Sequence, residues 1–221
     1  MKKIFFYGVL IVLLLLIPVT LLTVTPPALA FRSPASIANF IQRFFGLTLF
    51  TLLFVQLILG AFMDKIEERV GGWVFQFHVI EGVVIYSLAL LHPLFFMIFN
   101  RYIGSSWNPY FVFVDICLLC KTRVDFYYSL GRISFWLLTI TIFAGLFRKA
   151  TPWLKANWRK LHVLNYVIFL ITGLHGFFIG TDFQWQPFYS FAIIAYAIVV
   201  GVVVFIEIPR LYKNYINWVR S

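Results

Sequence analysis

The hydrophobic segment WVFQFHVIEGVVIYSLALLHPLFFMIF, residues 73–99, contains two of the four histidines in the chain, His78 and His92. In an α-helix these two residues lie about 21 Å apart along the axis and within about 40° of one face. Because the bilayer hydrocarbon is about 30 Å thick, this spacing predicts one histidine near each side of a membrane. The other two histidines, His162 and His175, lie on a second apolar segment and are thirteen residues apart.

The composition is typical of an integral membrane protein. Of the 221 residues, 62% are hydrophobic and 12% are charged. Soluble domains are about 45–50% apolar and about 25% charged. The net charge of +10 is what basic cytoplasmic loops give a membrane chain, so we expect the lipid bilayer as a partner and no nucleic acid.

Six apolar segments are long enough to cross a bilayer, which predicts an all-α integral membrane protein with six transmembrane helices. We expect these spans at residues 4–24, 40–62, 73–99, 126–147, 161–179 and 188–206. Residues 1–37 then form an N-terminal helix with an outer loop, residues 38–207 a domain with a four-helix core from spans two to five, and residues 208–221 a short cytoplasmic tail.

The first segment ends in a sequence that resembles a signal-peptidase site, Ala28-Leu29-Ala30. Its apolar run is longer than the roughly 7–15 residues of a signal core, so we favour an uncleaved helix. With the N-terminus in the cytoplasm, twelve Lys and Arg residues fall on the inner side and six on the outer side. The positive-inside rule therefore predicts a multi-pass protein of the plasma or inner membrane with both termini cytoplasmic. The loop 148–160 is the most basic, and the linker 100–125 is expected to lie on the membrane surface or dip into it.

Spans three and five run parallel in this topology, so their histidines pair in chain order. His78 faces His162 on the inner side, and His92 faces His175 on the outer side. Two facing imidazoles suit axial ligation of haem iron, whereas zinc requires three or four clustered ligands. Non-haem iron requires a carboxylate beside two histidines, and Glu81 offers one only at the inner site. Bis-histidine haem suits electron transfer, and it would make the four-helix core of spans two to five a haem-binding core. Helix–helix hydrogen bonding is the alternative role for the histidines.

The thirteen-residue spacing does not fit a regular helix. Thirteen residues turn an ideal helix to about 140° from the starting face. His162 and His175 therefore cannot both face span three unless helix tilt, an offset of the haems or a local distortion of the helix compensates.

Two pairs of glycines repeat the fourteen-residue spacing on the neighbouring spans: Gly46 and Gly60 in span two, and Gly131 and Gly145 in span four. The antiparallel topology places Gly46 and Gly131 near the outer site, and Gly60 and Gly145 near the inner site. Glycine has no Cβ, so a macrocycle can approach the backbone closely there. General helix packing is the alternative role.

Three further polar residues, and two cysteines on the outer side, remain to be assigned. Arg43 and Arg132, at the outer ends of spans two and four, suit the carboxylates of haem propionates, with interfacial snorkelling as the alternative. Glu81 could orient His162, relay a proton, contact a quinol or be structural. We expect Cys117 and Cys120 to be apolar filler, with a labile outer disulfide as the alternative.

The stretch LALLHPL (88–94), with His78 fourteen residues before His92, resembles the third helix of the ferric reductase-like transmembrane family. The stretch WRKLH (158–162), with Tyr166 and then LHG (174–176), resembles its fifth. The family includes membrane domains of NADPH oxidases, yeast-type ferric reductases and the haem subunit of the bacterial periplasmic methionine-sulfoxide reductase system. The resemblance implies six helices, two haem b groups, and electrons that move outward from a cytoplasmic donor. It also implies haem ligation by His78, His92, His162 and His175.

The sequence has neither a GxGxxG motif nor a P-loop, so we expect FAD or FMN only on a partner protein. The function we expect is transmembrane electron transfer by an oxidoreductase membrane component. Electrons would come from a separate cytoplasmic flavoprotein reductase or a quinol, and pass to ferric iron, oxygen or an extracytoplasmic reductase subunit. A haem-free scaffold or transporter-like protein, and a quinol-oxidising dihaem cytochrome b of another family, are the alternatives.

Overall fold

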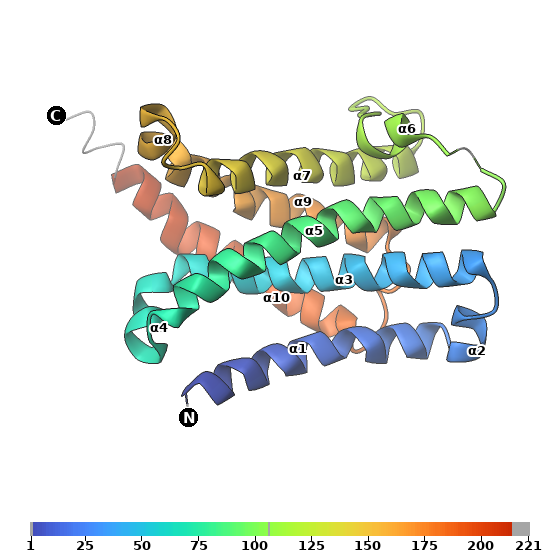
Figure 1. Ribbon diagram of the computed structural model, residues 1–221, viewed down its shortest axis with the longest axis horizontal. Coiled ribbons are helices and arrows are strands. Elements are labelled where there is room, and N and C mark those ends of the chain that lie inside the picture. Colours follow the sequence, from blue (N-terminus) through green and yellow to red (C-terminus); the bar gives the residue numbers. More distant parts are fainter. Residues whose placement is uncertain (1, 106, 214–221) are drawn as a thin grey trace.

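The long apolar runs of the sequence fold as helices in the computed structural model, which describes residues 2–105 and 107–213. Within these residues the fold is all-α, with no β-strand. The helices are α1 (Lys2–Val24), α2 (Pro27–Ala30), α3 (Pro34–Ala61), α4 (Met63–Val70), α5 (Trp73–Tyr102), α6 (Pro109–Phe113), α7 (Arg123–Leu146), α8 (Pro152–His162), α9 (Leu164–Ile179) and α10 (Phe188–Val202), followed by a π-helical turn, Val203–Glu207. In Figure 1, α1, α3, α5 and α7 lie along the length of the bundle, and α10 crosses it at an angle.

Five helical segments are long and apolar enough to cross a membrane, and a sixth is present if the bent pair α8–α9 is one span. The five are α1, α3, α5, α7 and the continuous helical segment Phe188–Lys213. The prediction of a multi-pass, all-α membrane chain is therefore confirmed. Each predicted span lies largely within one of these segments.

Hydroxyl side chains cap the beginnings of three helices. The hydroxyl of the residue before the helix accepts a backbone N–H bond at Ser33 before α3 (from Ser36, 3.2 Å), at Thr122 before α7 (from Asp125, 3.1 Å) and at Thr151 before α8 (from Leu154, 3.1 Å). Such caps satisfy N–H groups that have no partner inside the helix. The cap at Thr122 fixes the start of α7 two residues after Cys120.

Phe50 of α3 lies at the centre of the core and is 1% exposed. Its ring stacks on Phe169 of α9, with the ring centroids 4.7 Å apart. It meets Phe183 edge-on at 4.8 Å, and Phe188 at the start of α10 packs nearby at 6.1 Å. These contacts join α3, α9 and α10, and they fix the height at which α9 sits in the bundle.

α1 belongs to this same core, because Ile17 and Leu21 are part of the buried cluster around Phe50. Thr20 of α1 also accepts a hydrogen bond from the backbone N–H of Phe188, at 3.2 Å. The predicted boundary between residues 37 and 38 falls inside α3, so it does not separate two structural units.

Three segments outside the predicted spans contain helical structure that the sequence analysis did not specify. Residues 148–160, predicted as a loop, contain most of α8, because Thr151 and Pro152 supply an N-terminal cap and a first-turn proline. The predicted tail 208–221 begins as a continuation of the last helix through Lys213, and residues 214–221 lie outside the described residues. The linker 100–125 forms α6 and folds against α7, where Trp136 donates its indole N–H to the Phe113 carbonyl at 2.8 Å.

The two ends of the bundle are distinct in Figure 1. The start of α1, α4 and α8 lie at one end, which we call the α4/α8 end. α2 and α6 lie at the opposite end, which we call the α2/α6 end. The last described residues follow α10 back to the α4/α8 end, so the described chain starts and finishes at the same end of the bundle.

We expect Phe50→Ala to destabilise the bundle by on the order of 3–5 kcal/mol, because it empties a site where α3, α9 and α10 meet. Phe5→Ala, at a side chain that is 76% exposed, is the matched control and should change little. Thermal unfolding of the two variants in detergent, followed by circular dichroism, measures the difference. Equal effects of the two substitutions would contradict this account of the core.

Candidate functional site

The four histidines form two pairs across the bundle. The ring centroids of His78 on α5 and His162 at the end of α8 are 6.4 Å apart. Those of His92 on α5 and His175 on α9 are 6.5 Å apart. The histidines therefore pair in space in the order that parallel spans predict, His78 with His162 and His92 with His175. The His78/His162 pair lies toward the α4/α8 end, and the His92/His175 pair toward the α2/α6 end.

The separation within each pair is wider than a direct contact and similar to that of two ligands on one metal. A ring nitrogen lies roughly 1.2 Å from the imidazole centre, so at these distances nitrogens of the two rings come no closer than about 4 Å, beyond hydrogen-bond range. Two imidazole–metal bonds of about 2.0–2.1 Å, end to end, span the same gap. The geometry therefore leaves room for one metal atom between the rings in each pair.

The rings of His92 and His175 are fixed by the same kind of bond. The Nδ1–H of His92 donates to the Gln42 carbonyl of α3 at 2.8 Å, and the Nδ1–H of His175 donates to the Tyr127 carbonyl of α7 at 2.8 Å. Because a carbonyl only accepts hydrogen bonds, each Nδ1 must carry the proton. Each Nε2 then keeps a lone pair, which is the state of a metal-ligating histidine with its second nitrogen hydrogen-bonded to the protein.

The predicted glycines explain how the two rings reach a helix backbone. Gly46 and Gly131 are each four residues after the accepting carbonyl, so they lie beside it on the helix surface. A Cβ on Gly46 would lie 2.9 Å from Cε1 of His92, and one on Gly131 would lie 2.8 Å from Cε1 of His175. Any side chain at these positions would push the ring away. The glycines were predicted to admit a macrocycle, and the structure shows that they admit the histidine rings themselves.

The His78/His162 pair is held more loosely. A Cβ on Gly60 would lie 3.8 Å from Cε1 of His78, and one on Gly145 would lie 3.5 Å from Cε1 of His162, which are ordinary contacts. Within the described residues, Nδ1 of both rings is buried without a hydrogen-bond partner. The same glycine pattern is present here, but the ring-to-carbonyl bond is not formed.

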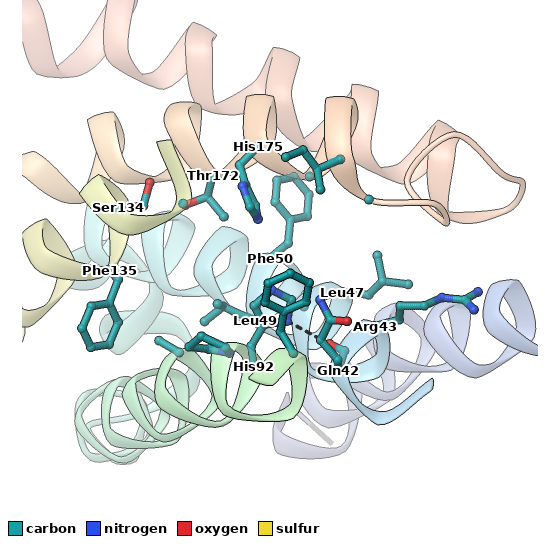
Figure 2. A pocket seen from close by; sticks show the side chains of 18 of the residues that line it. Gln42, Arg43, Leu47, Leu49, Phe50, His92, Ser134, Phe135, Thr172 and His175 are labelled. Atoms are coloured by element: carbon teal, nitrogen blue, oxygen red, sulfur yellow. Dashed lines mark hydrogen bonds between the residues drawn. The ribbon is translucent and has the colours of Figure 1, made fainter. Parts of the chain in front are cut away.

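A cavity of about 330 Å³ surrounds the His92/His175 pair. The two histidines lie on opposite walls, one from α5 and one from α9, and Phe50 and Thr172 are close by (Figure 2). Gly46 and Gly131 line the same cavity, as do Arg43 and Arg132. Its size falls in the range of about 300–1,000 Å³ that is usual for small-molecule and cofactor sites.

The two arginines predicted for propionates are both at this cavity, but both have protein partners. Arg43 is paired with Asp182, to which its Nε donates at 2.6 Å, and its Nη1 donates to the Thr25 hydroxyl at 2.8 Å. Arg132, which is 6% exposed, donates to the Asp115 carbonyl and lies over the Phe111 ring at 4.8 Å. Asp182 therefore already supplies a carboxylate to Arg43, whereas Arg132 forms no salt bridge with the described side chains.

Glu81 is buried one turn from His78 and is 4% exposed. Among the described residues, neither of its carboxylate oxygens has a hydrogen-bond partner, so no bond joins it to His162. Gln56 also reaches this region, where its amide donates to the His78 carbonyl at 2.9 Å. Its own oxygen is buried without a partner in the described structure. The His78/His162 region therefore has more buried polar atoms without a hydrogen-bond partner than the His92/His175 region has.

The thirteen-residue spacing of His162 and His175 is accommodated by a break in the span. α8 ends at His162, α9 begins at Leu164, and the two helices are bent by 41°. The local distortion that the spacing required thus falls directly after the first of the two histidines.

The cysteines were interpreted mainly as apolar filler, and this was wrong. Cys117 and Cys120 are joined by a disulfide. The CxxC spacing itself pointed to this disulfide, although no soluble redox fold surrounds it. Sequence reasoning also missed Ser129, a fully buried hydroxyl of α7 that contacts Cys117 Sγ at 3.4 Å.

Over the described residues, no group of three or more His, Cys, Asp or Glu side chains is arranged to hold a metal ion. Neither histidine pair therefore has a third His, Cys, Asp or Glu side chain placed to complete a metal site among these residues. Protein-family models, curated proteins and solved structures gave no match to this chain.

The Arg43–Asp182 pair is nearly removed from solvent, with side-chain exposures of 15% and 2%. Removing one partner leaves the other charge without compensation, so Asp182→Asn or Arg43→Met alone should cost about 3 kcal/mol. The double variant Arg43→Met/Asp182→Asn should be less destabilised than the sum of the two, which a double-mutant cycle of unfolding free energies measures. Simple additivity would show that the pair contributes no coupling.

Proposed function

We propose that this protein carries electrons across a membrane through two bis-histidine haem b groups, one at His78/His162 and one at His92/His175. The observation that carries the proposal is the arrangement at His92 and His175. Their Nδ1–H groups donate hydrogen bonds to backbone carbonyls. The 6.5 Å between their ring centroids leaves room for a metal atom and two metal–nitrogen bonds.

A flat metal macrocycle fits this arrangement better than a bare ion does. Two histidines alone do not complete a zinc or non-haem iron site, and no third protein ligand is present among the described residues. A macrocycle supplies the missing equatorial ligands itself. Haem would provide reversible one-electron chemistry there, without an open coordination position.

The chain's own residues perform three tasks in this proposal. The histidines ligate the metal, and the Gln42 and Tyr127 carbonyls orient two of their rings. The apolar walls of the cavity, such as Phe50, exclude water. At the rim, Arg132 is the better partner for a propionate, because Asp182 already balances the charge of Arg43.

The charge distribution supports a cytoplasmic donor at the α4/α8 end. α8 exposes Lys155, Arg159 and Lys160, and the positive-inside rule favours such an end in the cytoplasm. A basic surface beside His162 suits an acidic flavoprotein reductase that carries FAD or FMN. Electrons would then pass over about 21 Å of helix rise to the His92/His175 site, and from there to an extracytoplasmic acceptor. The resemblance to the ferric reductase-like family supports the same direction.

A quinol is the second candidate donor, and Glu81 is the observation that favours it. A buried carboxylate without a partner can accept a proton from a quinol as its electron leaves. Quinol analogues should inhibit electron entry in the native protein and should no longer inhibit it in Glu81→Gln. This result would select a quinol over a flavoprotein as the donor.

The purified protein should show a b-type reduced-minus-oxidised spectrum with two haems per chain. His92→Ala or His175→Ala should each lower the ratio to one, and so should His78→Ala or His162→Ala, because each removes one of only two axial ligands. Pyridine haemochrome absorbance per mole of chain measures the ratio. Colourless protein, or histidine variants with an unchanged spectrum and stability, would favour a haem-free scaffold.

The glycines give a sharper test, because they do not ligate. Gly46→Ala and Gly131→Ala should each displace a histidine ring, since their Cβ atoms would lie 2.9 and 2.8 Å from it. We expect loss of the haem at His92/His175, or at least a tenfold weaker haem affinity, which corresponds to about 1.4 kcal/mol.

Gly60→Ala and Gly145→Ala are the matched controls on the same two helices, because their Cβ atoms would make ordinary contacts. They should retain two haems per chain. If all four variants behaved alike, the close approach of His92 and His175 to the backbone would not be what holds the group.

A further inference from the structure

The CxxC loop packs directly against the wall of the His92/His175 cavity. Arg132 lines that cavity, and its Nη1 lies 3.4 Å from the Ser129 hydroxyl. The same hydroxyl lies 3.4 Å from Cys117 Sγ and accepts the Cys117 backbone N–H at 3.0 Å. Two contacts through one buried serine therefore connect the cavity wall to a sulfur of the Cys117–Cys120 disulfide.

A second short route starts at the histidine itself. His175 donates to the Tyr127 carbonyl. Tyr127 and Cys120 line one pocket of about 440 Å³, which the CxxC loop and the first turns of α7 form together. The disulfide thus lies within a few side chains of the histidine pair at the α2/α6 end.

The loop is also accessible. Leu119, between the two cysteines, is 100% exposed, and Leu118 is 71% exposed. Both cysteines are partly exposed, but their neighbours differ. Cys120 lies beside the cationic residues Lys121 and Arg123 in the pocket, whereas Cys117 contacts Ser129.

We propose that Cys117–Cys120 is a redox-active disulfide, which takes electrons from the His92/His175 centre and passes them to an extracytoplasmic disulfide substrate. This inference rests on the proposed haem function for its electron source. The disulfide accepts two electrons, one at a time, and two protons from water; the S–S bond breaks, two thiols form, and the centre is oxidised twice.

The exchange step follows from the surroundings of Cys120. Lys121, Arg123 and the nearby start of α7 stabilise a thiolate there, as cations and helix N-termini do. This thiolate attacks one sulfur of the substrate disulfide, and the other sulfur leaves as a thiolate. Cys117 then attacks Cys120, which releases the second substrate thiol and restores the disulfide. The net reaction reduces one substrate disulfide with two electrons and two protons.

The electron step is tested by counting thiols in the purified haem-loaded protein. The protein is reduced anaerobically with photoreduced flavin mononucleotide, quenched in acid and labelled with a maleimide that adds a known mass. We expect two thiols per chain in the native protein and none in His175→Ala. Haem absorbance is recorded in the same samples.

The two readouts separate the possible failures. Reduced haem with an intact disulfide would overturn this inference and leave the proposed function standing. Absence of haem from the native protein would overturn both, because the electron source would be missing. A disulfide that only clamps the loop would give the first of these results.

The exchange step is tested with single-cysteine variants and oxidised glutathione as the anionic disulfide probe. Cys117→Ser should form the mixed disulfide at Cys120 at least about tenfold faster than Cys120→Ser forms it at Cys117. Lys121→Gln/Arg123→Gln in the Cys117→Ser background should slow the reaction several-fold. Equal rates at the two cysteines would overturn the assignment of Cys120 as the attacking sulfur.

Discussion

The hydrogen bond from a histidine ring to a helix carbonyl is the interaction on which this bundle depends. A carbonyl in a membrane helix already accepts one N–H bond within its helix, and its second lone pair is usually covered by the side chain four residues on. Where that residue is glycine, the lone pair is open. His92 uses such an opening on α3, and His175 uses one on α7.

These bonds also explain which helices pack most closely. α5 packs most extensively along α3, and α9 along α7. Each of these two contacts contains one histidine seated on one glycine. Membrane helices gain little from hydrophobic burial against one another, so close approach at small residues and interhelical hydrogen bonds decide their pairing. The cavity between the two histidines lies where these two helix pairs face each other.

Much of this arrangement could be predicted from the sequence, because spacing in a helix converts directly into height and azimuth. The fourteen-residue repeats of His78 and His92, and of Gly46 and Gly60, placed each residue at the correct end of the bundle. Polar pairing could not be predicted in the same way. Arg43 was expected to face a propionate, which stays a prediction, and its pairing with Asp182, 139 positions away, was not foreseen. Only the three-dimensional packing shows which of two carboxylates is near.

The helix boundaries show a second kind of limit. Thr151 and Pro152 are an ordinary helix start, yet charge alone led the segment after them to be interpreted as a loop. The cysteines were misinterpreted for a related reason, because the CxxC motif was discounted in the absence of the soluble redox fold in which it usually occurs. Local rules such as caps and CxxC spacing hold in a membrane protein as they do elsewhere.

The break after His162 divides the histidines of the fifth span between two rigid pieces. His175 is fixed within α9, whose position is set by the Phe50–Phe169 contact in the core. His162 is the last residue of α8, an amphipathic helix with no fully buried residue. Any tilt of α8 relative to α9 moves this ring relative to His78 without moving His175. The ring separation of His92 and His175 is thus set by the packed core, whereas that of His78 and His162 depends on how α8 lies against α9.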